Sequence, residues 1–348
     1  MDGIASAYPL PDTMKRADGS ARFAYVTLLM LNDNYLPGVL TLAYGLRRQK
    51  TQADLVCLVT PQITAEARSA LALLFDHVVE VEPLFVPYKR RQARQYIPYV
   101  FTRMHMLRLG ADGDLGLRYE KLVALDADVL PIKHYDHLFT LNAPAGILNE
   151  SKTHFLDYDA DGKYIIPPSV AREGTWRWHE VYNPLCPHGR PIPQAITDRV
   201  KDDPTNMGVN SALVVVQPSL AEFAAVKADI QQPETLRYIG DLFEWPDMQY
   251  LTMRWSGTWH NVDIRFCGFS GYPNLAVLFG THYAGLKPWH FHKEQAMARY
   301  GRFEDFQYWF KQYTAMVTRA YPKLRKVKRL AWLLEQIEAL KSYGTTRD

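Results

Sequence analysis

The sequence is poor in cysteine and has no long apolar run near its start. Three cysteines occur among 348 residues, at positions 57, 186 and 267, and they share no metal-type spacing. An odd, sparse count gives no disulfide framework and favours a reducing compartment. The apolar run at residues 23–31 is much shorter than the ~20 residues that a membrane span needs, and no secretory pattern precedes it. We therefore expect a cytoplasmic protein without a transmembrane segment.

The net charge is also small. A formal charge of +3 gives no reason to expect a nucleic-acid partner. Hydrophobic residues make up 47% of the chain and charged residues 22%, which is typical of a globular protein large enough for a sizeable core. The main departure is an excess of aromatic side chains, with 21 Tyr and 8 Trp. Aromatic residues are common in cores, but they also line carbohydrate and nucleotide sites.

The N-terminal third alternates apolar runs with helical patterns. Residues 23–31, 54–60 and 77–84 read as strands, and residues 39–50 and 63–75 read as helices between them. Continuously apolar strands that alternate with helices indicate a parallel sheet covered on both faces. The sequence therefore predicts an α/β fold with a Rossmann-like, mostly parallel sheet.

A further strand carries two carboxylates. A helix is expected at residues 99–110, and the strand after it runs into Asp126-Ala127-Asp128. An ionised carboxylate without a partner is costly to bury, so a compensating group is expected there. Ligands of open α/β sheets bind beyond the carboxyl ends of the strands. Both Asn32-Asp33 and the Asp-Ala-Asp triplet fall at such ends.

Regular patterns are lost at residues 150–205 and return later. We expect this Pro- and Trp-containing stretch to be an insertion that covers a site. A strand follows at residues 211–219. Residues 324–344 show apolar positions at helical spacing, with Lys and Arg clustered at the start. This helix is expected to dock on the domain or on a partner subunit of a homodimer, with attachment to a membrane surface as the alternative.

Two acidic clusters are candidates for a metal site. Residues 157–163 have the spacing that opens an EF-hand calcium loop, but Pro168 stands where that loop needs a bidentate Glu, so a polar turn is the better interpretation. The triplet at 126–128 follows an apolar strand, and its carboxylates repel unless a cation lies beside them. Carboxylates suit Mg²⁺ or Mn²⁺, which complete their shells with substrate phosphates.

A segment further along the chain strengthens the second candidate. Residues 281–291, THYAGLKPWHF, combine His282, Gly285 and Lys287. These supply an imidazole ligand, a glycine that allows close backbone approach, and a cation suited to phosphate. Together with the triplet they indicate a site for a metal and a diphosphate, although a lone His or Lys is more often structural or solvated.

The chain resembles the glycogenin-like, retaining glycosyltransferases of family 8, which have the GT-A fold. Four parts of the chain carry the resemblance: AYVTLLMLNDNYLPGVLTLAYGLR with LVCLVTPQIT, RQYIPYVFTRMHMLRL, LVALDADVL, and NSALVVVQPS with HYAGLKPW. The resemblance implies a GT-A domain over residues 22–295, including the insertion, and a C-terminal helical extension over residues 296–348.

The resemblance also implies roles for particular residues. Asp126, Asp128 and His282 match the family's metal ligands. The residues that would contact the nucleotide-sugar donor are Thr27, Asn32, Asp33, Tyr35, Arg94, Arg103, Ala127, Gly285 and Lys287. Asn210 and Asp247 match residues beside the donor sugar, and with Lys287 they form the expected catalytic set. Helix capping is the alternative for Asp247, and Met248 stands where the family usually has Gln.

The resemblance thus implies a metal-dependent transferase that uses Mn²⁺ or Mg²⁺ and a UDP-sugar donor. A hexose or pentose such as glucose, galactose or xylose would pass to a hydroxyl of a glycan or protein acceptor. Two alternatives remain open, a self-glycosylating primer and a non-catalytic binding protein. A nucleotidyltransferase would need a Gly-rich basic loop after the first strand, and LNDNYLPG is not such a loop.

Overall fold

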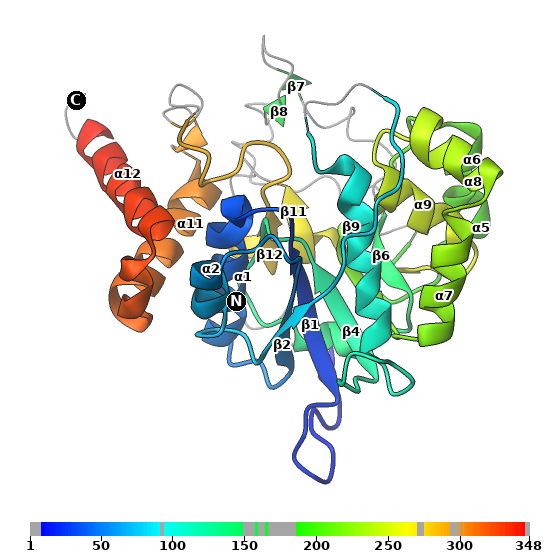
Figure 1. The fold of residues 1–348 in the computed structure, drawn as a ribbon, viewed down its shortest axis with the longest axis horizontal. Coiled ribbons are helices and arrows are strands. Elements are labelled where there is room, and N and C mark those ends of the chain that lie inside the picture. The colour runs from blue at the N-terminus through cyan, green and yellow to red at the C-terminus, as the bar shows by residue number, and fades with distance from the viewer. Residues whose placement is uncertain are drawn as a thin grey trace.

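The structure of the chain is a computed structural model. The structure describes residues 8–90, 94–148, 157–158, 164–165, 186–269, 275–292, 297, 300–301 and 303–344. Within this part, the chain folds around one large sheet with helices on both sides (Figure 1).

The central sheet has seven strands in the order β10-β6-β9-β4-β1-β2-β3. Their bounds are β1 Phe23–Leu29, β2 Asp54–Val59, β3 His77–Glu80, β4 Lys121–Leu125, β6 Ala145–Leu148, β9 Val209–Val216 and β10 His260–Asn261. Strand β9 runs antiparallel to both of its neighbours, and the other neighbouring pairs are parallel. The predicted mostly parallel α/β sheet is confirmed.

Strand β1 shows why these apolar runs form internal strands. Alternate residues point to opposite faces of a sheet. Phe23 and Tyr25 belong to the hydrophobic core on one face, and Ala24 and Val26 belong to the core on the other. Because both faces are covered, the strand is apolar at every position except Thr27 instead of alternating with polar residues.

Helices α1 Leu36–Arg48 and α2 Ala65–Leu71 follow β1 and β2 as predicted, with α2 shorter than expected. Two expectations need correction. The expected helix at 99–110 is a 3-10 helix, η3 Ile97–Leu109. Strand β3 ends at Glu80 rather than at residue 84.

The remaining described elements lie around the rest of the sheet. They include the 3-10 helices η2 Asp33–Tyr35, η4 Asp136–Thr140, η6 Ile264–Cys267 and η7 Leu275–Val277, and the helices α5 Gln194–Thr197, α6 Arg199–Asp202, α7 Leu220–Asp229, α8 Pro233–Arg237, η5 Tyr238–Leu242 and α9 Pro246–Arg254. Of the predicted insertion, the antiparallel pair β7 Asp157–Tyr158 and β8 Tyr164–Ile165 and residues 186–205 are described. Residues 159–163, which carry most of the EF-hand-like cluster, lie outside the described residues.

A second, smaller sheet has the order β11-β12-β5. Its strands are β5 Val129–Pro131, β11 Gly268–Phe269 and β12 Gly280–His282, and β12 runs antiparallel to β5. The register pairs His282 with Val129. A residue late in the chain is thereby fixed next to the Asp-Ala-Asp triplet.

The C-terminal segment folds back onto the main core. It comprises α11 Glu304–Ala315, η8 Met316–Ala320, η9 Pro322–Lys326 and α12 Lys328–Gly344. Phe306, Trp309, Leu330 and Ile337 belong to the same hydrophobic cluster as β1 and α1. The predicted helix at 324–344 therefore exists from Lys328 onward and docks on the domain. None of the described helices is long and apolar enough to cross a membrane.

Candidate functional site

Asp126 and Asp128 lie in a tight turn between β4 and β5. The amide of Asp126 donates to the carbonyl of Ala212 on β9 at 2.9 Å, which extends the β4–β9 pairing by one residue. The amide of Val129 donates to the carbonyl of Asp126 at 3.0 Å and closes the turn. The triplet thus sits at the carboxyl end of β4, where ligands of such sheets bind.

His282 reaches this turn through the β5–β12 ladder. Beyond the ladder, the amide of Tyr283 donates to the carbonyl of Asp128 at 2.9 Å. One ligand atom from each of Asp126, Asp128 and His282 lies within 4.8 Å of the others, and together they are the group of described residues suited to hold a metal ion. The structure therefore brings together the three predicted metal ligands.

The Asp128 carboxylate is buried and faces two basic groups. Lys287 Nζ donates to Oδ2, and His282 Nε2 lies 3.5 Å from Oδ1. Burial raises the pKa of the Asp128 carboxyl, but the charges of Lys287 and His282 outweigh it and hold the pKa well below its usual range. Oδ1 accepts no hydrogen bond from a described residue. The buried carboxylate is thus ionised and has an oxygen suited to a cation.

The Lys287 ammonium is held in place by the backbone as well as by Asp128. It donates to the carbonyl of Tyr283 at 2.6 Å and to that of Ala284 at 3.3 Å, and the residue is 5% exposed. Gly285, in the same loop, is exposed, and a side chain added there would meet nothing within 4 Å. The loop therefore presents open backbone at Gly285 beside a buried cation.

Arg103 links the triplet to Asp247. Its guanidinium lies 3.1 Å from Asp126 Oδ1 and 2.9 Å from Asp247 Oδ2. Desolvation and the negative charges of Asp128 and Asp247 raise the pKa of the partly exposed Asp126 carboxyl. The positive charge of Arg103 lowers this pKa in part, and the net effect is a raised pKa. Ser211 Oγ donates to Asp247 Oδ2 at 3.1 Å. One arginine therefore holds two carboxylates from distant parts of the chain in one cluster.

The alternative assignment of Asp247 as a helix cap is wrong. Helix α9 has Trp245 at its N-cap, and the Asp247 carboxylate bonds to Arg103 and Ser211 instead. The capping bond comes from Gln249, whose Oε1 accepts from the amide of Trp245 at 2.8 Å. Gln249 is fully buried and also donates to two backbone carbonyls. The displaced Gln of the family motif is therefore a structural residue here.

Asn210 is buried on β9, next to Ser211. Its Oδ1 accepts from the amide of Ala212 at 2.9 Å, the residue whose carbonyl bonds to Asp126. This bond fixes the orientation of the Asn210 amide on the strand beside the triplet.

The predicted nucleotide loop follows β1. Asn32 caps η2 by accepting from the amide of Asn34, and Asp33 accepts from the hydroxyl of Thr64 at 2.7 Å, which ties the loop to the start of α2. Thr27 is buried on β1, and its Oγ1 has no hydrogen-bond partner among the described residues. Asp33 thus has a structural partner, whereas Thr27 has unused hydrogen-bonding capacity.

Tyr35 belongs to an aromatic group beside the triplet. Its ring lies edge-on to Tyr96 and Trp289, with centroids 6.2 and 5.4 Å away. Burial, followed by the nearby Tyr96 and Asp128, raises the pKa of Tyr35, and the charge of the exposed Arg94 lowers it in part. Tyr35 is therefore close enough to both Asp128 and Arg94 for their charges to act on its hydroxyl.

Three residues at the site were missed by the sequence analysis. Tyr96 lies two positions after Arg94, and Ser211 follows Asn210, but neither residue type carries a distinctive signal. Gly38 in α1 is required by packing, because a Cβ there would lie 2.5 Å from the carbonyl oxygen of Ala127 and 2.4 Å from the Trp289 ring. A glycine at this position lets α1 approach the triplet closely.

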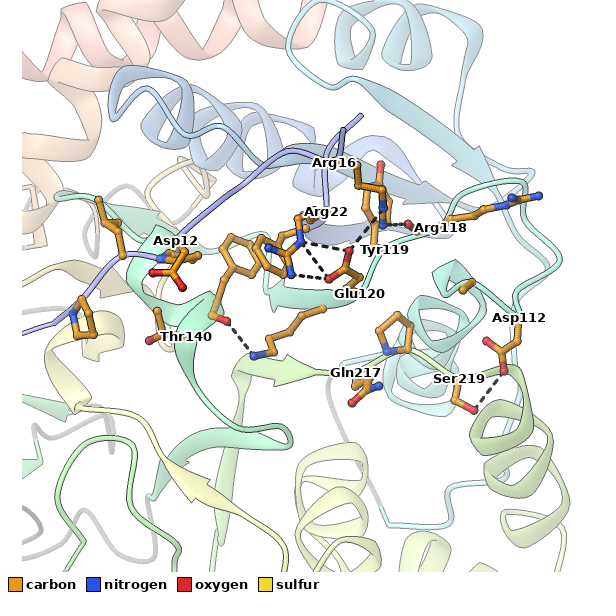
Figure 2. A pocket seen from close by; sticks show the side chains of 18 residues that line it. Asp12, Arg16, Arg22, Asp112, Arg118, Tyr119, Glu120, Thr140, Gln217 and Ser219 are labelled. Atoms are coloured by element: carbon orange, nitrogen blue, oxygen red, sulfur yellow. Dashed lines mark hydrogen bonds and ion pairs between the residues drawn. The ribbon is translucent and has the colours of Figure 1, made fainter. Parts of the chain in front are cut away.

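A separate cavity lies at the opposite edge of the sheet, where β1 and β4 begin. It encloses about 1090 Å³, and Figure 2 shows Arg16, Arg22 and Glu120 on its wall. Arg22 bonds to Glu120 at 2.8 Å, and Arg16 lies 3.5 Å from the same carboxylate. Arg16 also donates to the carbonyls of Ala21 and Arg118, so these side chains hold the N-terminal segment against the start of β4.

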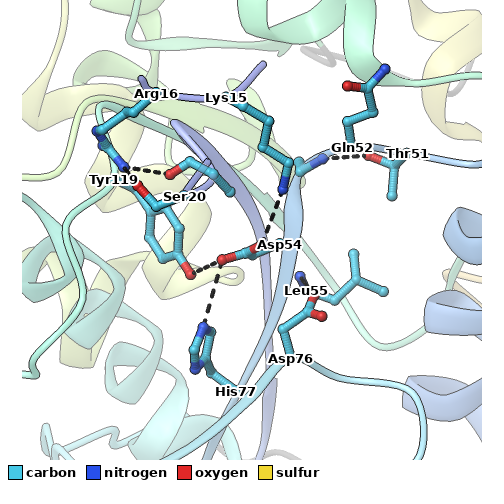
Figure 3. A network of polar contacts seen from close by, with 12 residues as sticks. Lys15, Arg16, Ser20, Thr51, Gln52, Asp54, Leu55, Asp76, His77 and Tyr119 are labelled. Atoms are coloured by element: carbon cyan, nitrogen blue, oxygen red, sulfur yellow. Dashed lines mark hydrogen bonds and ion pairs between the residues drawn. The ribbon is translucent and has the colours of Figure 1, made fainter. Parts of the chain in front are cut away.

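The polar network next to it also stabilises the fold. In Figure 3, the Asp54 carboxylate accepts from the hydroxyl of Tyr119 at 2.9 Å and meets Lys15 at 3.9 Å and His77 at 3.6 Å. These contacts fasten the N-terminal segment and β3 to the start of β2.

Comparison with known proteins gives several similar sequences, and no family model matches the chain. The uncharacterised protein R707 of Acanthamoeba polyphaga mimivirus is 27% identical over 250 residues, which cover 70% of this chain and 71% of R707. Galactinol synthase 10 of Arabidopsis thaliana is 34% identical over 134 residues, which cover 38% of each protein. Galactinol synthase 4 of the same plant is 33% identical over 137 residues, which cover 39% of each protein. The match thus spans little more than a third of these two synthases.

A solved structure is similar over most of its length. The galactosyltransferase LgtC in complex with donor and acceptor sugar analogues is 14% identical, with a TM-score of 0.46, and the match covers 80% of this chain and 96% of LgtC.

Proposed function

The chain belongs to glycosyltransferase family 8, and we propose that it transfers a hexose or pentose from a UDP-sugar to an acceptor hydroxyl with retention of anomeric configuration. The observation that carries this proposal is the convergence of Asp126, Asp128 and His282 beyond the carboxyl end of β4. All three metal ligands implied by the family are present and adjacent. This favours a catalytic member of the family over one that only binds nucleotide sugars.

The donor set fits a divalent cation. Two carboxylates and one imidazole suit Mn²⁺ better than Ca²⁺, which prefers oxygen ligands only. The buried Asp128 oxygen without a hydrogen bond fits the same role. A bound divalent ion would stabilise the negative charge that grows on the diphosphate as the anomeric bond breaks.

The protein's own cations can also stabilise the negative charge of the departing diphosphate. Lys287 lies beside the open backbone at Gly285, so we assign it to the donor diphosphate. In this arrangement the Lys287 ammonium and a metal ion share the negative charge of Asp128. Arg103 keeps Asp126 oriented while it also holds Asp247.

Asp247 and Asn210 would lie beside the donor sugar. Arg103 and Ser211 keep the Asp247 carboxylate oriented, and the backbone of Ala212 orients the Asn210 amide. A fixed carboxylate can stabilise positive charge at the anomeric carbon in an oxocarbenium-like transition state. The aromatic group around Tyr35 and the unused hydroxyl of Thr27 are assigned to the nucleoside.

A donor screen tests this function. The protein is incubated with Mn²⁺ and a panel of nucleotide sugars, without acceptor, and release of the nucleotide is measured. We expect slow hydrolysis of one UDP-sugar among UDP-glucose, UDP-galactose and UDP-xylose. Intact-mass analysis of the same samples separates transfer to the protein itself from release to water. Absence of turnover with every nucleotide sugar, despite nucleotide binding, would contradict the proposal.

A further inference from the structure

The C-terminal helices present a strip of exposed cations. Between Asp305 and Glu335 the chain has no acidic residue. Five exposed cations fall within seven positions of η9 and the start of α12, and we call them the basic strip: Lys323, Arg325, Lys326, Lys328 and Arg329. The ion pairs among the described residues include none of them. Their charge is therefore not neutralised within the part of the chain that the structure describes.

The apolar residues between these cations explain why all five point outward. Leu324, Val327 and Leu330 recur every three residues, and all three are buried in the main hydrophobic core. The residues between them must then face away from the core. The strip is a solvent-facing surface on a firmly docked segment.

The position of the strip is unfavourable for the stability of α12. Lys328 and Arg329 lie in the first turn of this helix, which contains no acidic residue. The helix macrodipole disfavours cations at this end, and clustered like charges repel one another. Stability of the fold therefore gives no reason for the strip, and an anionic partner would.

Trp332 extends the strip with an exposed aromatic ring. It is 46% exposed, and it lies three and four positions after Arg329 and Lys328, so it is on the same side of the helix. Its ring meets Phe291 only edge-on, with centroids 6.5 Å apart. Leu330, Leu333, Leu334 and Ile337 dock the helix without it.

We propose that the basic strip and Trp332 bind the surface of a membrane that contains anionic lipids. Cations attract anionic headgroups, and an indole ring beside them is suited to the boundary between headgroups and acyl chains. A polyanion such as a nucleic acid would use the cations but would not require one partly buried indole ring. The surface thus fits a lipid headgroup layer better than a soluble polyanion.

The strip also adjoins the predicted nucleotide loop. Arg329 Nη2 donates to Oδ1 of Asn34 at 2.6 Å, and Asn34 lies between Asp33 and Tyr35. Figure 1 shows α12 in red at the outer edge of the molecule, next to α11. A membrane bound to this face would lie close to the nucleotide loop. The binding itself does not depend on the proposed function.

Vesicle sedimentation tests the proposal. The full chain is mixed with phosphatidylcholine vesicles or with phosphatidylcholine–phosphatidylglycerol vesicles at low ionic strength. We expect sedimentation only with the anionic vesicles, weakened by salt. The combined change Lys323→Gln, Arg325→Gln and Lys326→Gln should weaken binding on the order of 100-fold, because each cation near such a surface contributes about fivefold. Arg329 is left unchanged, so the nucleotide loop keeps its contact.

A matched variant removes the same charge elsewhere. Lys50→Gln, Lys227→Gln and Arg237→Gln together change exposed cations outside the strip and should leave most of the binding intact. Trp332→Ala should weaken binding several-fold without changing the salt dependence. Equal loss in both triple variants would overturn the proposal. Vesicle binding that is unaffected by Trp332→Ala and abolished by stoichiometric heparin would instead assign the strip to a soluble polyanion.

Discussion

The Nε2 atom of His282 lies 3.5 Å from Oδ1 of Asp128, although the two residues come from distant parts of the chain. The register of the small sheet explains this proximity, since His282 pairs with Val129, the residue after Asp128. A shift of one residue in this ladder would turn His282 to the opposite face of the sheet. The geometry of the candidate metal site is therefore set by strand pairing.

The first prediction concerns metal binding. Asp126→Asn, Asp128→Asn and His282→Ala should each weaken Mn²⁺ binding by tenfold or more, because each removes one ligand atom of the cluster. Calorimetric titration with Mn²⁺ measures the affinity. The double variant Asp159→Asn and Asp161→Asn changes the EF-hand-like cluster and serves as the control. If the control lost Mn²⁺ and the three single variants kept it, the metal site would be misplaced.

The second prediction concerns Lys287. Lys287→Ala should raise the activation free energy of sugar transfer by about 2.7–4 kcal/mol. This is the usual effect of losing one electrostatic contact to developing negative charge. Binding of uridine, which has no phosphate, should be unchanged. Single-turnover rates and uridine titrations measure the two effects. A wild-type transfer rate in the folded variant would exclude Lys287 from the reaction.

Lys287→Ala should also show a stability change that depends on metal. Removing the ammonium leaves the buried Asp128 carboxylate without its strongest partner, which costs about 3–5 kcal/mol of unfolding free energy. Mn²⁺ should recover much of this loss, because it supplies a new counter-charge to the same carboxylate. Denaturant unfolding with and without Mn²⁺ measures the difference. A loss of stability that Mn²⁺ did not reduce would argue against metal contact with Asp128.

The third prediction concerns Asp247. Asp247→Asn should remove most sugar transfer while the melting temperature changes little, because the amide oxygen can still accept from Ser211 and Arg103 keeps Asp126 as a counter-ion. Binding of UDP and Mn²⁺ should persist. Glu244→Gln, three residues earlier, makes the same chemical change and should transfer sugar normally. Normal transfer by Asp247→Asn would remove Asp247 from the mechanism.

The fourth prediction concerns pH. His105 accepts from Arg108 at Nδ1 and donates from Nε2 to the carbonyl of Glu82, so it is bound in its neutral form. Burial lowers its pKa from 6.5 to about 4. The unfolded state therefore binds more protons between these values, and stability should fall as pH falls from about 6.5 to about 4, by up to about 3 kcal/mol. Denaturant unfolding measured across this pH range should show that the free energy of unfolding of His105→Gln depends less steeply on pH than that of the wild-type protein. An identical slope in the variant would contradict the assignment.

The sequence was sufficient to predict the large sheet, because local patterns set it. The strands β1, β2 and β4 are apolar except for Thr27 and for Asp54 and Lys121 at the starts of β2 and β4, and helices follow β1 and β2 as their patterns predict. The sequence could not predict that residues 97–109 form a 3-10 helix, since the same apolar positions fit an α-helix. The sequence also could not predict that Phe306 and Trp309 dock into the main core, because a helical pattern does not identify the surface against which the helix packs.

The site was predictable in part for the same reason. The triplet is local, and its place after a strand can be read directly from the sequence. The contacts that complete the site are not local. Arg103 joins Asp126 to Asp247, and Lys287 joins Asp128 to the loop after β12. Only the family resemblance indicated Arg103 and Asp247 in advance, whereas the composition of residues 281–291 also indicated Lys287. Both gave roles toward a ligand rather than contacts between the residues.

The most direct test of a metal-assisted donor site is the affinity of the protein for UDP with and without Mn²⁺. A metal held by Asp126, Asp128 and His282 should bind the diphosphate of the nucleotide. Calorimetric titration of chelator-treated protein with UDP gives the affinity without metal. The same titration in excess Mn²⁺ gives the affinity of the metal-bound protein. We predict at least tenfold tighter binding with Mn²⁺, and loss of this gain in Asp128→Asn. Equal UDP affinity in both titrations of the wild-type protein would rule out a metal that binds the diphosphate at this site.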